Sequence, residues 1–240
     1  MRIPVLYLPK TRFKKFLYIQ KRYKCNQLIV PLGCDCHPAY VLKSLYLRNY
    51  SLPFDWLSIN PVRTFEYMNE NINDKFENFL KNPKLNERGY FISEKYPYSE
   101  FMHEKDLNSQ ETINKFERRI DRFLKILKSR QIYFLHNIPV NSLQAESDIN
   151  LYINSIKLFQ SKIPAGSTIH IYLRFDENLS ENELLSEKLY SELLSLNIHA
   201  YKYLRGLKDN GIWGNASYYH YLLANLGLKI KMTFPKIFLK

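Results

Sequence analysis

The sequence predicts a single α/β domain in which helices cover both faces of a mostly parallel sheet, with Rossmann-like or flavodoxin-like layering. Short apolar runs alternate with segments of helical spacing, as is typical of βαβ units. Hydrophobic residues make up 45% of the 240 positions, which is enough to fill a core. The chain shows no internal repeat and no linker rich in proline or glycine. We therefore expect one domain over residues 25–240, preceded by a basic, aromatic N-terminal arm over residues 1–24.

Each expected element follows from its local pattern. Short apolar runs, rich in branched side chains, predict strands over 27–32, 131–136, 167–174 and 197–203. Apolar residues three and four positions apart predict a helix that opens at Pro38, and further helices over 62–71, 112–129, 149–161, 182–196 and 217–226. Residues 72–110 have weak periodicity, and we expect an irregular insertion there.

The positive charge is concentrated at one end of the chain. Lys and Arg number 35 against 23 Asp and Glu, and residues 1–24 hold eight basic residues and no acidic one. An anionic membrane surface suits this basic and aromatic arm, because rings settle at headgroup depth while Lys and Arg reach phosphates. A solvated tail is the simpler interpretation, and nucleic acid is the partner that we expect least.

Cysteine usage and hydropathy bear on the compartment. Three cysteines, with Cys34 and Cys36 one residue apart, do not form a disulfide framework. No apolar run is long enough to cross a bilayer, and the N-terminus lacks the pattern of a secretory signal. We expect a cytoplasmic protein that can associate with the inner face of the membrane through its arm.

The loop over residues 33–38 carries the candidate chemistry. It follows the first predicted strand, and ligands gather at the carboxyl ends of strands in open α/β sheets. A cysteine just before a helix meets the positive end of the helix dipole, which favours the thiolate, and the free amides there can bind an oxyanion. The alternatives are structural thiols, a zinc site made of Cys34, Cys36 and His37, and a Cys-x-Cys redox pair.

The same loop opens a longer motif. A leucine-glycine pair, Leu32-Gly33, is separated by two residues from Cys36, which is followed by His37-Pro38. The block Pro53-Phe54-Asp55-Trp56 begins seventeen residues after Cys36. Two further stretches accompany it: Phe101-Met102-His103-Glu104, and a helix over 115–123 that contains a double arginine.

On these residues the chain resembles the bacterial and viral family labelled papain-like cysteine peptidases, over about residues 28–136, with a weaker echo at Trp213-Gly214-Asn215. The resemblance implies that Cys36 is the nucleophile and His103 its partner. A Cys–His pair makes sulfur reactive at neutral pH, and the same His can protonate a leaving group. Asp55 is our candidate for orienting the His103 ring, and a turn or N-cap aspartate is the alternative.

Three arginines are candidates for binding an acidic group of the substrate. Arg118 and Arg122 share one face of the predicted helix, and Arg119 points about 100° away from Arg118. A solvated basic helix face is the common alternative. Trp56 is a further candidate for contacting substrate, although tryptophan more often packs in a core.

These features favour a cysteine-dependent hydrolase, a peptidase or amidase, that acts on a peptide, glycan or acyl substrate. We expect no metal and no bound cofactor. The first alternative is an acyltransferase or esterase in the synthesis of surface polysaccharide or glycan, for which acyl-CoA would be the co-substrate. The second is a basic protein without catalytic activity that binds an acidic partner or a membrane surface.

Overall fold

A parallel sheet forms the centre of the computed structural model, which describes residues 2–7, 14–128, 131–177, 182–207 and 211–239. Its strand order is β10-β9-β8-β3, and neighbouring strands run parallel throughout. These strands are β3 (Ile29–Leu32), β8 (Tyr133–Pro139), β9 (Thr168–Asp176) and β10 (His199–Arg205). All four were expected from apolar runs, and the predicted α/β layering with a parallel sheet is confirmed.

Helices cover both faces of this sheet because its strands are apolar on both sides. Ile29, Leu135 and Tyr172 pack toward α1 (His37–Ser44) and α6 (Tyr219–Asn225). Their chain neighbours face the opposite way, toward the remaining helices of the sheet, which are α2 (Thr64–Asn73), α4 (Glu146–Gln160) and α5 (Glu183–Ser195). Each of these helices overlaps a predicted one.

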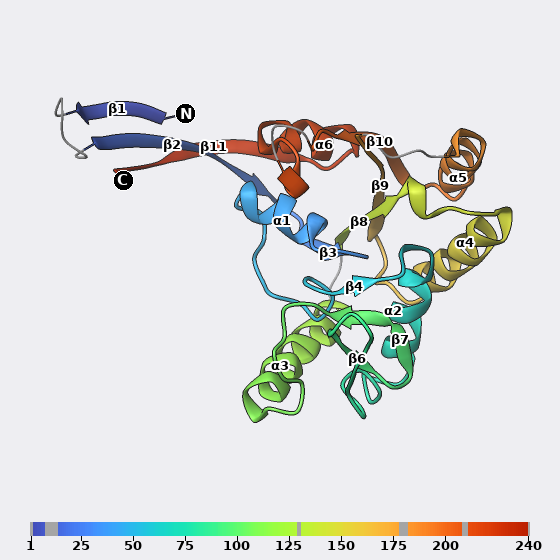
Figure 1. Cartoon of the computed structure of the whole chain (residues 1–240). Coiled ribbons are helices and arrows are strands. Elements are labelled where there is room, and N and C mark those ends of the chain that lie inside the picture. Colours follow the sequence, from blue (N-terminus) through green and yellow to red (C-terminus); the bar gives the residue numbers. More distant parts are fainter. Residues whose placement is uncertain (1, 8–13, 129–130, 178–181, 208–210, 240) are drawn as a thin grey trace.

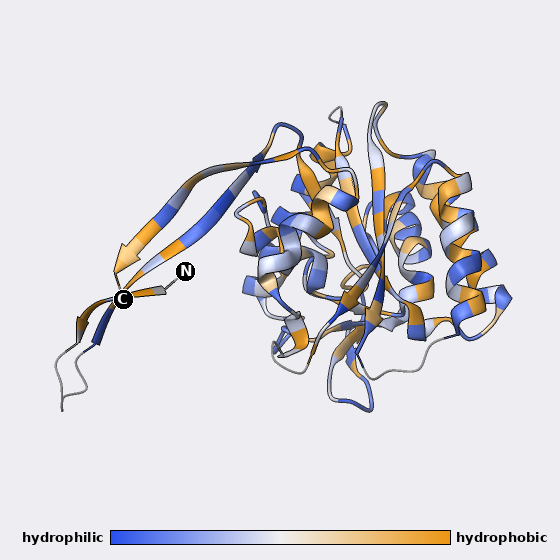
Figure 2. Ribbon diagram, turned by 90° about the horizontal axis from the view of Figure 1, so that it is seen from above, coloured by the Kyte–Doolittle hydropathy of each residue, from blue (hydrophilic) through white to orange (hydrophobic). Residues whose placement is uncertain are grey.

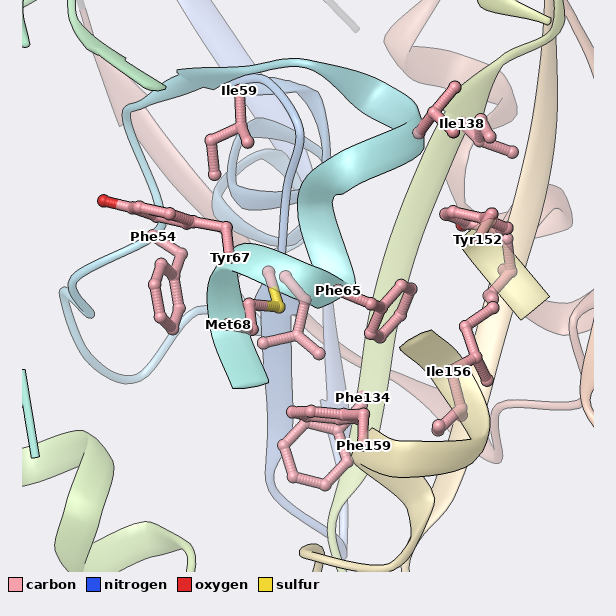
Figure 3. Packing of buried hydrophobic residues seen from close by; sticks show 14 of the residues in the cluster. Phe54, Ile59, Phe65, Tyr67, Met68, Phe134, Ile138, Tyr152, Ile156 and Phe159 are labelled. Atoms are coloured by element: carbon pink, nitrogen blue, oxygen red, sulfur yellow. The ribbon is translucent and has the colours of Figure 1, made fainter. Parts of the chain in front are cut away.

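The larger core cluster joins helices that are distant in sequence. Figure 3 shows Phe65 of α2 beside Tyr152 and Phe159 of α4, close to Phe134 of β8. The ring of Phe65 meets those of Tyr152 and Phe159 at centroid distances of 5.6 and 5.3 Å, both edge to face. Such pairs add to the free energy gained from burying the rings. By these contacts the cluster fixes α2, which follows Cys36 in the chain, against the parallel sheet.

A second, antiparallel sheet lies beside the first, so the molecule is not purely parallel. Its order is β4-β7-β6-β5, and with α3 (Gln110–Ile126) it forms the lower part of the molecule in Figure 1. Its strands are β4 (Ser58–Ile59), β5 (Lys84–Leu85), β6 (Phe91–Ser93) and β7 (Tyr96–Phe101). The expected irregular insertion over 72–110 is therefore wrong, because three of these strands lie within it. β5 and β6 are too short to show an alternating pattern, and β7, with six residues, buries its last three in a row instead of alternating.

The basic N-terminal segment forms part of a third sheet. Strand β2 (Lys14–Cys25) pairs with β1 (Arg2–Tyr7) on one side and with the C-terminal strand β11 (Ile230–Leu239) on the other, both antiparallel. Figures 1 and 2 show β2 and β11 extending together away from the body of the molecule. Residues 1 and 8–13 of the expected arm lie outside the described residues. The sequence did not predict that the arm would pair with the other end of the chain.

Four short 3₁₀ helices complete the described structure: η1 (Pro61–Arg63), η2 (Val140–Ser142), η3 (Gly211–Trp213) and η4 (Ala216–Tyr218). Among the described residues, no helix has both the length and the apolar composition that a bilayer crossing requires.

Candidate active site

The turn between β3 and α1 presents Cys36. Gly33 opens the turn, and the absence of a side chain there makes room for the carbonyl oxygen of Asp35. The carbonyl of Cys34 accepts a hydrogen bond from the backbone N–H of Ile59 in β4, at 2.7 Å, which ties the turn to the antiparallel sheet. Cys36 caps the N-terminus of α1, and its carbonyl accepts from the N–H of Tyr40. The sulfur therefore lies just beyond the carboxyl end of β3.

Cys36 contacts His103. Sγ of Cys36 lies 3.4 Å from Nε2 of His103, which is hydrogen-bonding distance for sulfur. The two residues are 67 positions apart in the sequence. Cys36 comes from the parallel sheet and α1, whereas His103 follows β7 of the antiparallel sheet. The structure thus brings together the two residues that the motifs singled out.

Trp56 supports the ring of His103. The two rings meet edge to face, with centroids 5.7 Å apart and an angle of 87° between their planes. The guanidinium of Arg48 lies 5.2 Å from the centre of the Trp56 ring, a cation–π distance. Trp56 is half-buried, and the contacts just described hold it between Arg48 and His103, so that it positions the His103 ring. Contact between Trp56 and a substrate stays a prediction.

Asp55 is fully buried and holds Arg48. Its Oδ2 accepts hydrogen bonds from Nε and Nη2 of Arg48 and from the backbone N–H of Leu52, the first at 3.1 Å and the last at 3.0 Å. Burial raises the pKa of Asp55, although Arg48 acts in the opposite direction. The sequence makes Asp55 the candidate for orienting His103. In the structure its carboxylate bonds to Arg48 and Leu52, so its influence on His103 passes through Arg48 and Trp56.

The surroundings of Cys36 disfavour a thiolate. Burial, together with the carboxylates of Asp35 and Asp55, raises the pKa of Cys36 to about 12, while the backbone amide of Cys36 itself acts in the opposite direction. The expectation of a lowered pKa is therefore wrong. The partial charge at a helix N-terminus does not offset burial and two nearby carboxylates. Cys36 carries its proton at neutral pH, with His103 within reach of it.

Asp35 belongs to an ion-pair network at the carboxyl ends of the strands. Its carboxylate pairs with Nη1 of Arg174 and accepts from the backbone N–H of His37 at 2.9 Å. Arg174 also pairs with Asp176 at 3.2 Å, and Asp176 accepts from Nε of Arg205 at 2.6 Å. Burial acts to raise the pKa of Asp35, but Arg174 and His37 outweigh it, and the pKa is lowered. The network anchors the residue next to Cys36.

The three candidate zinc ligands point in different directions. Sγ of Cys34 lies 3.4 Å from the carbonyl oxygen of Asn137, and the thiol is buried. His37 bonds through Nδ1 to the hydroxyl of Tyr172, at 2.6 Å, while Cys36 contacts His103. Within the described part of the chain, no group of three or more His, Cys, Asp or Glu side chains could hold a metal. The residues of this loop do not fit a zinc site.

Two of the three candidate arginines approach the site. Arg122 donates through Nη1 to the carbonyl oxygen of Ser51 at 2.7 Å. Arg119 is half-buried; burial lowers its pKa, although the charge of Asp55 acts in the opposite direction. Arg118 is exposed to solvent on α3. Binding of a substrate by these arginines stays a prediction.

A hollow lies along the face of α1 that carries Cys36. Tyr40 follows Cys36 by four positions, so the two share this face, and the ring of Tyr40 stacks on Trp213 at 4.0 Å. The hollow has a volume of about 570 Å³, and no lining residue is acidic: Gln20, Tyr40, Lys43, Ser44, Tyr46 and Arg48. A second hollow of about 430 Å³ shares Gln20, Tyr40 and Ser44. Neither Cys36 nor His103 lines these hollows, which reach the helix that follows Cys36 through Tyr40 and Ser44.

The fold and the site define an α/β protein with a candidate thiol site, in which a parallel sheet positions the cysteine and an antiparallel sheet positions the histidine. The chain belongs to the family described as "Putative papain-like cysteine peptidase (DUF1796)", which matches residues 27–178. The family resemblance seen in the sequence is thereby confirmed. Cys36, Asp55 and His103 all lie within the matched residues.

The chain is also similar to "Uncharacterized protein R408" of Acanthamoeba polyphaga mimivirus. The two are 28% identical over 175 aligned residues, which cover 62% of this chain and 77% of the viral protein. The comparison with solved structures gave no match.

Two residues of the site, Arg48 and Arg174, are not singled out by the sequence motifs. Asp55 lies between two aromatic residues, and a buried carboxylate needs a partner. Arg48, seven positions earlier, is the nearest cation in the sequence, which indicates it as that partner. Arg174 is the last residue of the strand predicted over 167–174. A charge at the carboxyl end of a parallel strand is itself a signal for a residue near the site.

Proposed function

We propose that this protein is a cysteine hydrolase in which Cys36 attacks the carbonyl carbon of an amide or ester and His103 carries the proton. The 3.4 Å contact between Sγ of Cys36 and Nε2 of His103 supports this proposal most strongly, because it puts a nucleophile within reach of a base. Family membership agrees with it, since the family is described as cysteine peptidases.

The raised pKa of Cys36 favours general-base catalysis over a thiolate that is already formed. As Sγ bonds to the carbonyl carbon, its proton moves to Nε2 of His103. The imidazolium of His103 then protonates the leaving amine or alcohol as its bond to the carbonyl carbon breaks, which leaves a thioester on Cys36. Water attacks the thioester, His103 takes its proton, and the acid departs as the sulfur regains a proton.

The backbone amide of Cys36 is a candidate oxyanion donor. It lies close enough to its own sulfur to lower the pKa of the thiol. A carbonyl attacked by that sulfur develops negative charge near the same amide, and a fixed donor there stabilises the transition state.

The hollow along α1 is our candidate for holding the part of a substrate that extends away from the reacting carbonyl. At a rise of 1.5 Å per residue, Ser44 lies about 12 Å along the helix from Cys36. Lys43 and Arg48 line the hollow, and Tyr40 supplies an aromatic surface. We infer a peptide, glycan or acyl substrate whose far end is polar or acidic.

Intact-mass measurement after incubation with an activated acyl ester tests the proposal. We expect one acyl adduct on the wild type and on Cys25→Ala, a matched control whose thiol is half-buried in β2, and none on Cys36→Ala. Equal labelling of Cys36→Ala, or a wild type that is never labelled, would overturn it.

The fate of the adduct separates hydrolysis from transfer. Release as free acid in water is the result expected of a hydrolase. An adduct that forms from acyl-CoA and leaves only when an alcohol or amine acceptor is added would instead make the protein an acyltransferase.

A further inference from the structure

The sheet formed by β1, β2 and β11 has a surface that the proposed function does not use. It extends from the body of the molecule in Figure 2. Its strands lie outside the residues that match the family, since β2 ends at Cys25 and β11 begins at Ile230. This sheet therefore lies outside the matched residues, as do α5, β10 and α6, and its two faces differ in chemistry.

One face is apolar. The strand register places Leu17 beside Ile3 on one side and Leu239 on the other, and it pairs Ile19 with Ile237. Side chains that pair across strands point to the same face. Ile237 is 58% exposed and Leu239 is 60% exposed. Exposed apolar side chains that adjoin across three strands mark an interaction surface rather than scattered surface residues.

The other face carries most of the basic residues, beside the stacked rings of Tyr18 and Phe238. Lys24 pairs with Lys231, Arg22 with Thr233, and Gln20 with Lys236. Like charges directly opposite each other destabilise a sheet, so the pair of Lys24 and Lys231 carries a cost that an anionic partner would remove. The three strands hold eight Lys and Arg and not one Asp or Glu.

Strand β11, at one edge of this sheet, adds a large exposed aromatic residue. The register shifts between Thr233 and Lys236, and Phe234 within this irregular segment is 93% exposed. Met232, two positions earlier, is 65% exposed. Phe and Leu on one side of an element with Lys and Arg on the other are typical of elements that lie in a lipid interface.

We propose that this sheet docks on an anionic membrane surface. The apolar face enters the headgroup region, while the flexible stems of the Lys and Arg side chains let their charges reach the lipid phosphates. A second copy of the chain would cover the apolar faces but leave the basic faces without a partner. A nucleic acid would bind the basic face and leave the apolar face in water. An anionic bilayer matches both faces, and β1 and β2 act in this surface together with β11.

Co-sedimentation of the full chain with vesicles tests this proposal. We expect binding to phosphatidylcholine vesicles that contain phosphatidylserine, no binding to pure phosphatidylcholine, and loss of binding at high salt. A basic residue near an anionic surface contributes enough that Lys24→Ala with Lys231→Ala should weaken binding about 25-fold. Ile237→Ser with Leu239→Ser should also weaken it, because it removes apolar contact.

Matched variants on the body of the protein keep the test specific. Lys125→Ala with Lys157→Ala removes two exposed charges, and Leu184→Ser with Leu204→Ser removes two exposed apolar side chains. Both should leave vesicle binding unchanged. The proposal is overturned if these controls weaken binding as much as the sheet variants. It is also overturned if the chain binds duplex nucleic acid but no vesicle. A wild-type dimer that binds no vesicle, and that Ile237→Ser with Leu239→Ser dissociates, would overturn it as well.

Discussion

A Cβ at Gly33 would stand 2.0 Å from the carbonyl oxygen of Asp35, so the turn before α1 forms only with glycine at this position. The same turn places the Asp35 carboxylate on Arg174 and Sγ of Cys36 near Nε2 of His103. One close approach in the backbone thus controls both the ion-pair network and the candidate catalytic pair.

Gly33→Ala should therefore slow the acylation of Cys36 while the fold away from this turn stays as it is. The Asp35 carbonyl must move away from the new methyl group, and Cys36 moves with it. Because misplacement by about 1 Å costs roughly 100-fold in rate, we expect a loss of that order in the rate of Cys36 acylation. Gly89→Ala is the matched control: its positive φ makes alanine unfavourable too, but nothing lies within 4 Å of the added Cβ. Acylation that is equally slow in both variants would refute the role of the turn.

Arg48→Ala should destabilise the protein by about 3–5 kcal/mol at neutral pH, because it leaves the buried carboxylate of Asp55 without its cation. Burial already raises the pKa of Asp55 above its ordinary value. Protonation at low pH removes the buried charge, so the loss in the free energy of unfolding should shrink as the pH falls from 7 toward the ordinary value of about 4.

Urea unfolding at several pH values measures this dependence. Arg88→Ala removes the partner of Glu100, and Arg88 is 64% exposed, so this control should lose no more than about 1 kcal/mol. A loss in Arg48→Ala that stays constant across the pH range would show that Asp55 is not the group responsible.

Asp35→Asn should lower the pKa of Cys36. The carboxylate of Asp35 is one of the causes that raise this pKa, and its removal also frees the positive charge of Arg174 to act on the thiol. Ultraviolet absorbance of the thiolate, followed as the pH is raised, should show ionisation at lower pH than in the wild type. Asp121→Asn, an exposed change on α3, should leave the curve in place. An unchanged curve in Asp35→Asn would show that this carboxylate does not act on Cys36.

The sequence predicts β3, β8 and β9 of the parallel sheet well because these strands are buried on both faces. All residues 133–139 of β8 are buried, and the apolar run that opens it is a strong local signal. Strands β4 and β5 contain two residues each, too few for any periodicity. Strand β2 pairs with β11 from the other end of the chain, and local patterns carry no information about such a distant partner.

The candidate site is predictable where a motif carries it. The motifs singled out Cys36 and His103, which are in contact. The expected bond from Asp55 to His103 is not made: Arg48, only seven positions away, and the N–H of Leu52 both bind Oδ2, and Oδ1 is buried without a hydrogen-bond partner among the described residues. The pKa of Cys36 depends on Asp55 as well as on burial, and both are consequences of tertiary packing that the order of residues does not reveal.

The rate at which Cys36 is acylated in His103→Ala tests the account most directly. A general base in contact with the thiol contributes about 10²–10⁴ in rate, so we expect a fall of that size relative to the wild type, with partial recovery when free imidazole is added. His199→Ala, distant from Cys36 in the chain and on β10, should acylate at the wild-type rate. Unchanged acylation of Cys36 in His103→Ala would contradict the proposed role of the Cys36–His103 pair.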